Sequence, residues 1–184
     1  YRTVHKIPMQ LRRTKTKFSY MNQIALSENM VYYIGLKNHL YSLNLHTQKL
    51  KNISLLKGIE RPLNTSIFLA QHNHLIYSDT NGNLILINLK HNIIKWKKKL
   101  DTHFLAGFKL YNDIMIGIGL DNIVYAINIT DGSLVWKYID PVKFFSPKEH
   151  LYSVSVPFIT NNKVFCALLN GNLVALDLLS GAYN

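Results

Sequence analysis

The sequence contains a repeat that returns every 40 to 49 residues, and this repeat limits the possible folds more than any other feature. Each copy has an apolar run, a polar turn, a second apolar run that ends in Asn or Asp, another turn and a third apolar run. We call the Asn or Asp the anchor; successive anchors lie 44, 40 and 49 residues apart. The four anchors are Asn44, Asn88, Asn128 and Asp177. Such a period is typical of architectures that stack one small structural unit many times.

The apolar runs are short and rich in Ile, Val, Leu, Tyr and Phe, which favours strands over core helices. One more apolar run precedes each copy, so each unit supplies four strands, and Asn-Gly pairs at residues 81–82 and 170–171 are typical of tight hairpins. We therefore predict an all-β fold, a β-propeller of four-stranded antiparallel blades. A β-solenoid is the structural alternative. The blades are expected at approximately residues 21–60, 65–101, 104–140 and 152–184.

Three copies share a spaced motif around the anchor. The third copy has Ala126, Asn128, Gly132 and Trp136, the fourth has Ala175, Asp177 and Gly181, and the second has Asn88, Asn92 and Trp96. This pattern resembles the tryptophan-docking motif of quinoprotein-type propellers, in which Ala, Asp, Gly and Trp hold the four places. The first copy is degenerate, with Ser42, Asn44, Gln48 and Asn52.

Each place in the motif suits a physical role. An Asn or Asp anchor can accept hydrogen bonds from the backbone of the following turn, and Gly or Asn provides the positive φ that this turn needs. The resemblance implies that the Trp packs between adjacent blades, where its large flat ring contributes buried area. These residues are predicted to be structural, and the sequence assigns no partner-binding residue.

Within this class the chain resembles the BamB family of outer-membrane assembly lipoproteins. The resemblance covers approximately residues 65–184 and rests on residues 116–120, 124–136 and 154–157 with the fourth copy. That family has eight blades, so we expect a fragment of a seven- or eight-bladed ring. The resemblance implies a non-catalytic protein-binding scaffold at the periplasmic face of the outer membrane, with a tether in the full-length protein. The implied partners are the periplasmic domains of the barrel-inserting protein BamA and unfolded outer-membrane proteins.

Two other functions share the fold. A fragment of a quinone-dependent dehydrogenase would need adjacent cysteines and a calcium site, but Cys166 is the single cysteine and lies in an apolar run. A stress-sensor ectodomain would be followed by a membrane span and a kinase. The pair His72 and His74 lacks a third metal ligand nearby in the sequence. We predict no enzyme activity, no cofactor and no metal.

The net charge of +11 is partly local. Basic residues dominate residues 1–20, and a second cluster surrounds Trp96. Such patches can bind nucleic acid or an anionic membrane, but the chain favours Lys, Asn, Ile and Tyr throughout, and no nucleic-acid motif accompanies the charge. We predict no nucleic-acid partner. The chain opens on Tyr1, so we expect its natural start to lie upstream, and we expect a Trp or another large aromatic residue to follow Asn184.

Overall fold

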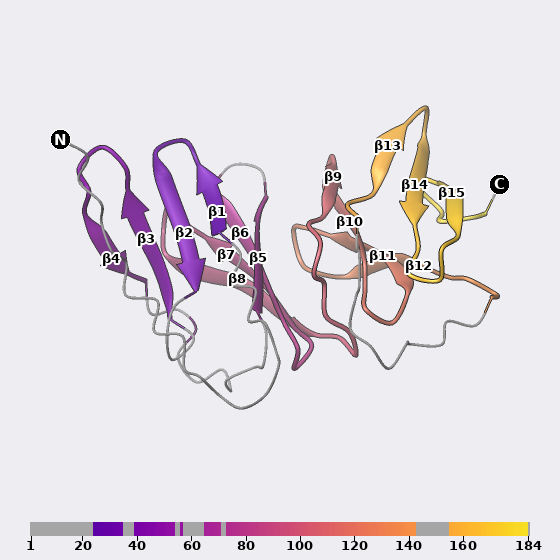
Figure 1. The fold of residues 1–184 in the computed structure, drawn as a ribbon, viewed down its shortest axis with the longest axis horizontal. Helices are drawn as coiled ribbons and strands as arrows, with labels where there is room; N and C mark the ends of the chain where they lie inside the picture. Colours follow the sequence, from indigo (N-terminus) through magenta and orange to yellow (C-terminus); the bar gives the residue numbers. More distant parts are fainter. Residues whose placement is uncertain are drawn as a thin grey trace.

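The computed structural model describes residues 24–34, 39–53, 56, 65–70, 73–142 and 155–183, and the basic segment 1–20 lies outside them. The described residues form four antiparallel sheets in chain order (Figure 1). The first sheet contains β1 (Ile24–Ser27), β2 (Met30–Ile34), β3 (Leu40–Asn44) and β4 (Leu50–Asn52). The second contains β5 (Thr65–Ala70), β6 (His74–Asp79), β7 (Asn83–Asn88) and β8 (Ile93–Lys99). The third contains β9 (Lys109–Tyr111), β10 (Ile114–Ile118), β11 (Ile123–Asn128) and β12 (Leu134–Ile139), and the fourth contains β13 (Phe158–Thr160), β14 (Lys163–Ala167) and β15 (Leu173–Asp177).

The all-β prediction is confirmed, because every regular element among the described residues is a strand. Each sheet is a meander in which neighbours in sequence are neighbours in space. The fourth sheet has three described strands plus an isolated antiparallel bridge between Leu176 and Tyr183. The described part of the chain contains no helix of the length and apolarity that a membrane crossing requires.

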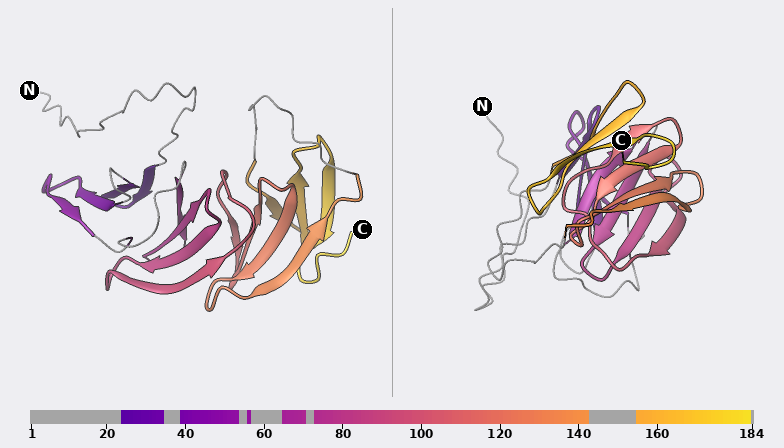
Figure 2. Two further views of the ribbon diagram at one scale, coloured as in Figure 1. Left: turned by 90° about the horizontal axis from the view of Figure 1, so that it is seen from below. Right: turned by 90° about the vertical axis from the view of Figure 1, so that its right-hand side faces the viewer.

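The hydrophobic core lies between the sheets rather than within one of them. Seen from below, the four sheets stand beside one another in a row (Figure 2). Because side chains alternate along a strand, each sheet sends one set of residues toward the sheet before it and one toward the sheet after it. Three buried clusters result, one between each pair of adjacent sheets. We call these three contacts joints 1–2, 2–3 and 3–4.

A backbone hydrogen bond repeats in all four sheets. The residue after each anchor donates its N–H to the carbonyl of the residue 16 places earlier, at the turn before the second strand of the sheet. The four bonds are Leu45 to Asn29, Leu89 to Asn73, Ile129 to Asp113 and Leu178 to Asn162. The sequence repeat is therefore also a repeat of backbone geometry. Of the apolar run that precedes the third copy, residues 105–110, only residues 109–110 belong to a strand, β9.

Candidate protein-docking site

Trp96 closes joint 2–3. It lies on β8, the outer strand of the second sheet, and only 9% of its surface remains exposed. Its indole Nε1 donates a hydrogen bond to the carbonyl of Ile129 in the third sheet, at 2.8 Å. The ring covers Gly132 in the same turn, since a Cβ added there would lie 2.8 Å from Cδ2 and Cε3 of Trp96. The indole of Trp96 can therefore pack directly on the backbone of Gly132, which a side chain at that position would prevent.

Trp136 closes joint 3–4 in the same way. Its indole Nε1 donates to the carbonyl of Leu178 at 3.1 Å. A Cβ added at Gly181 would lie 2.5 Å from Cε3 of Trp136. Tyr138 and Tyr183 stack beside this contact, with ring centroids 6.2 Å apart. The two joints thus share one arrangement, in which an indole of one sheet lies on a glycine of the next.

The anchors shape the turn on which each indole rests. Asn128 accepts a hydrogen bond from the backbone N–H of Thr130 at 2.7 Å, and Asp177 accepts from Ser180 N–H at 2.8 Å. Asn88 and Asn44 make equivalent bonds to His91 and Thr47. The Asp177 carboxylate also accepts from the Ser180 hydroxyl, and these bonds hold the pKa of Asp177 below its ordinary value. All four anchors therefore cap the turn that follows them.

The residue four places after each anchor has positive φ in every sheet. The angle is 71° at Gly132 and 70° at Gly181, but also 53° at Asn92 and 55° at Gln48. Asn can adopt the left-handed conformation, as Asn92 does here, so positive φ by itself does not explain why the other two sheets have glycine. The glycines stand where an indole of the preceding sheet covers the turn. Ala126 is fully buried in joint 3–4, opposite Trp136, and Ala175 is half-buried on β15.

The first sheet departs from the gapless alignment that placed Asn52 at the tryptophan position. In the second and third sheets a β-bulge before the Trp brings it opposite Leu86 and Ala126 respectively. The pairing of β3 with β4 has no such shift, and Ser42, the counterpart of Leu86, pairs with Lys51. Lys51 therefore holds the docking position of joint 1–2, and Asn52 lies on the opposite face.

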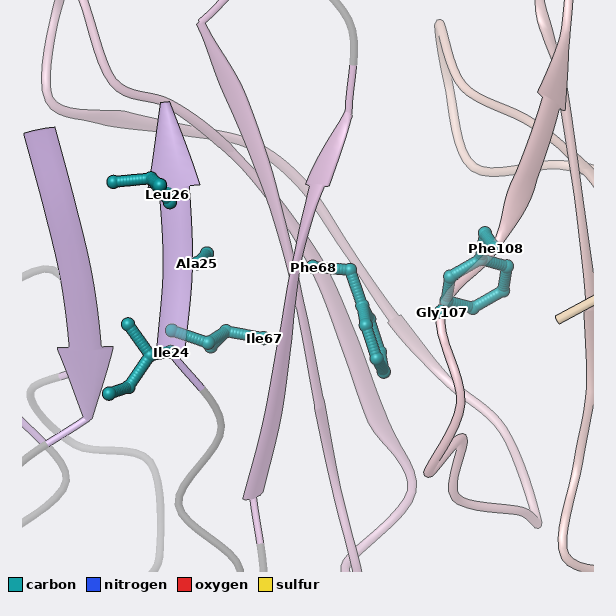
Figure 3. A pocket seen from close by; sticks show the side chains of 7 residues that line it. All are labelled: Ile24, Ala25, Leu26, Ile67, Phe68, Gly107 and Phe108. Carbon is teal, nitrogen blue, oxygen red and sulfur yellow. The ribbon is translucent and has the colours of Figure 1, made fainter. Parts of the chain in front are cut away.

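An apolar depression lies where the first strands of neighbouring sheets converge. Strands β1 and β5 are in contact, and the depression of about 470 Å³ spans them and residues 107–108. Figure 3 shows Ile67 pointing from β5 toward β1, and Phe68 pointing to the other side toward Phe108. Phe68 and Phe108 meet edge to face with centroids 5.6 Å apart. Ile24 and Leu26 are 64% and 58% exposed, so this wall is open to an apolar partner.

Two polar side chains are buried at the end of β6 and in the segment that follows β8. Asp79 has no exposed surface and accepts hydrogen bonds from the Tyr77 hydroxyl, from two backbone N–H groups and from the side chain of Asn83. His103, 3% exposed, lies with its Nε2 3.3 Å from the Ser66 hydroxyl, while its Nδ1 has no hydrogen-bond partner among the described residues. Burial lowers the pKa of His103 to about 4, against a smaller opposite effect of Asp79. This imidazole is therefore neutral at pH 7.

The residues considered for chemistry are dispersed. Cys166 is fully buried in joint 3–4, and burial raises the pKa of its thiol to about 12. His74 lies with Nε2 3.5 Å from the amide nitrogen of Asn88, while its sequence partner His72 is outside the described residues. Across the residues that the structure describes, no three His, Cys, Asp or Glu side chains gather as metal ligands.

The outer strands β4, β8 and β12 each end a sheet, and within the described ranges one edge of each has no strand partner. They differ in chemistry. The edge of β12 carries exposed Leu134 and Ile139, whereas β8 carries Lys95, Lys97, Lys98 and Lys99. Lysines on an edge discourage unspecific strand pairing. The more apolar β12 is the better edge for adding a strand of a partner.

Repeated antiparallel sheets, with an indole of the outer strand closing two of the three joints, define a β-propeller of the quinoprotein-like class. A family model described as outer membrane protein assembly factor BamB matches residues 48–183. The chain belongs to this family, and the resemblance inferred from the sequence is confirmed.

Individual relatives agree with this assignment. The outer membrane protein assembly factor BamB of Yersinia pestis is 27% identical, with 91% of this chain and 45% of that protein covered. The crystal structure of BamB from Moraxella catarrhalis superimposes with a TM-score of 0.66 at 18% identity, over 91% of this chain and 50% of that one. The computationally designed Ika4 protein gives a TM-score of 0.61 at 12% identity, over 87% of this chain and 94% of that one. The structures support the fold, and the chain spans about half the length of the BamB proteins it matches.

Proposed function

We propose that this chain is part of a non-catalytic scaffold that binds protein partners during the assembly of outer-membrane proteins. The observation that carries the proposal is the pair of indole-on-glycine joints at Trp96 and Trp136, together with family membership. Joints of this kind keep neighbouring sheets in a fixed relation, so surfaces on different sheets can act as one platform. A rigid platform loses little conformational entropy when a partner docks.

Two surfaces are suited to docking. The depression beside β1 and β5 offers exposed aliphatic side chains and half-buried phenyl rings, and the outer edge of β12 offers backbone groups for strand addition. By resemblance, the partners are the periplasmic domains of BamA and unfolded outer-membrane proteins, and the location is the periplasmic face of the outer membrane. The Trp side chains are proposed to support these surfaces and not to contact the partner.

A binding assay tests the proposal. The periplasmic domains of BamA from the same organism are immobilised, and the full-length protein and residues 1–184 are each passed over them. We expect saturable binding, and weaker binding after Leu134→Lys and Ile139→Lys on the β12 edge. The rival dehydrogenase is tested by adding a quinone cofactor and calcium and following dye-linked alcohol oxidation. Turnover there, with no binding to the BamA domains, would overturn the proposal.

A further inference from the structure

The outer end of joint 1–2 differs from the other two joints in what fills it. Register places Lys51 of β4 at the docking position, on the face of the first sheet that carries Tyr32 and packs toward the second sheet. Lys51 is exposed, whereas Trp96 and Trp136 are buried at 9% and 8% exposure. Deeper in the same joint the core is closed, with Leu40 and Tyr77 fully buried. Joint 1–2 therefore has a closed hydrophobic core, but at its outer end a lysine stands where the other two joints have a tryptophan.

The second sheet presents more lysines to the same place. Lys97 pairs with Ile85, and Ile85 belongs to the buried cluster shared with the first sheet. Lys99 lies two residues further along the same face, where its ammonium group donates to the carbonyl of Asn81. Register thus places Lys51 on one side of joint 1–2 and Lys97 and Lys99 on the other, and all three side chains are exposed.

Among the residues that the structure describes, the turn that faces joint 1–2 has no counterpart of the carboxylate found at joint 2–3. At that joint Lys98 lies beside the turn of the third sheet, and its positive charge contributes to lowering the pKa of Asp131 in that turn. The equivalent residue in the turn of the second sheet, three places after the anchor, is His91. The lysines of joint 1–2 thus face a histidine where joint 2–3 has a carboxylate.

We propose that the outer end of joint 1–2 binds an extended acidic segment of a partner protein. Lys97 and Lys99 are two residues apart on a strand, which spaces their Cα atoms by roughly 7 Å. An extended peptide with Asp or Glu at alternate positions repeats its carboxylates at the same interval, and Lys51 meets it from the opposite wall. A carboxylate-bearing strand fits this double row better than a flat anionic membrane does. The inference refines the scaffold proposal by naming the chemistry of one partner segment.

The test uses a fluorescein-labelled twelve-residue peptide with Glu at alternate positions, and its Gln counterpart. Fluorescence anisotropy at low salt should show binding of the Glu peptide and not of the Gln peptide. Lys97→Glu and Lys51→Glu should each weaken binding about tenfold, since loss of a favourable pair and a new repulsion together exceed the 1.4 kcal/mol of one decade. Binding should also weaken strongly when salt rises above about 0.15 M.

Lys137→Glu is the matched control. Lys137 holds on β12 the position that Lys97 holds on β8, opposite Tyr125, is exposed, and faces joint 2–3, which Trp96 fills. Its reversal makes the same change in net charge and should alter affinity less than about twofold if joint 1–2 is the site. Equal losses at Lys97 and Lys137 would overturn the inference, because net charge alone would then govern binding.

Vesicles containing phosphatidylglycerol supply the other arm. Vesicle binding that depends on Lys51 and Lys97, with no binding of the Glu peptide, would overturn the acidic-segment assignment in favour of a lipid headgroup. Failure of the peptide to bind while the protein still binds the BamA domains would overturn this inference and leave the scaffold proposal standing. If the protein binds the Glu peptide but does not bind the BamA domains, the scaffold proposal is overturned and the acidic-segment inference stands.

Discussion

The contact between Trp96 and Gly132 allows a double-mutant cycle with a worked magnitude. Replacing Gly132 by Ala adds a Cβ at 2.8 Å from the indole, in a backbone with a φ of 71°. The left-handed conformation costs an L-residue about 1–2 kcal/mol. Forcing a methyl group into packed surroundings costs about 1–3 kcal/mol more. We therefore expect Gly132→Ala to lower the free energy of unfolding by about 2–5 kcal/mol in total.

The two contributions separate when the indole is removed. In the Trp96→Ala background the added Cβ meets no ring, so Gly132→Ala should then cost about 1–2 kcal/mol, the conformational part alone. The coupling energy between the two substitutions is expected to be about 1–3 kcal/mol. Trp96→Ala by itself should cost about 3–5 kcal/mol, and Trp96→Leu replaces it in the cycle if that variant does not fold.

Urea unfolding followed by circular dichroism measures all four corners of the cycle. Removal of Trp96 changes fluorescence for trivial reasons, so the fluorescence signal is not used. Asn92→Ala is the matched control, since Asn92 occupies the same turn position with a φ of 53° but faces no indole. That substitution should cost about 1 kcal/mol or less. An equal cost of Gly132→Ala with and without the ring would refute the reasoning.

Three further predictions concern buried groups. Asp79→Ala should lower the free energy of unfolding in urea by at least about 3 kcal/mol, because it removes the acceptor of two buried donors, the backbone N–H and the side-chain amide of Asn83. The unfolded chain binds a proton at His103 below a pH of about 6.5, while the folded chain, with a pKa of about 4, does not; stability should therefore fall by about 3 kcal/mol as pH drops from 6.5 to 4, and His103→Gln should reduce that slope. Cys166 should react with a thiol reagent such as DTNB at the rate of unfolding, because burial raises its pKa to about 12; prompt reaction in native buffer would contradict its placement.

The turns of this fold could be predicted from the sequence because their chemistry is local. An anchor oxygen reaches N–H groups two or three residues away, so the spacing from Asn128 to Gly132 already contains the geometry. The all-β class follows from period and composition for the same reason. Contacts between residues that are distant in the sequence are harder to predict. His103 and Ser66 are 37 residues apart, and no repeated spacing connects them.

The position of Lys51 shows a second limit. A gapless comparison of the repeats assigns Asn52 to the place of Trp96, because it assumes that each outer strand counts residues alike. The bulge in β8 inserts one residue, and β4 has none. Since a shift of one residue turns a side chain to the opposite face of a sheet, the alignment selects the wrong residue although the fold is right.

The tryptophan and the glycine of the motif belong to different partners, so the joint rather than the blade is the unit that varies. When the motif is compared within one blade, the second sheet matches it only in part, because it has Trp96 but has Asn92 where the motif has glycine. Taken joint by joint, each case is simple. Joint 2–3 pairs an indole with Gly132, joint 3–4 pairs an indole with Gly181, and joint 1–2 has neither. Glycine is required where a ring would meet a Cβ, and where the ring is missing Asn suffices for the turn. A substitution of either member therefore acts on the neighbouring blade as much as on its own.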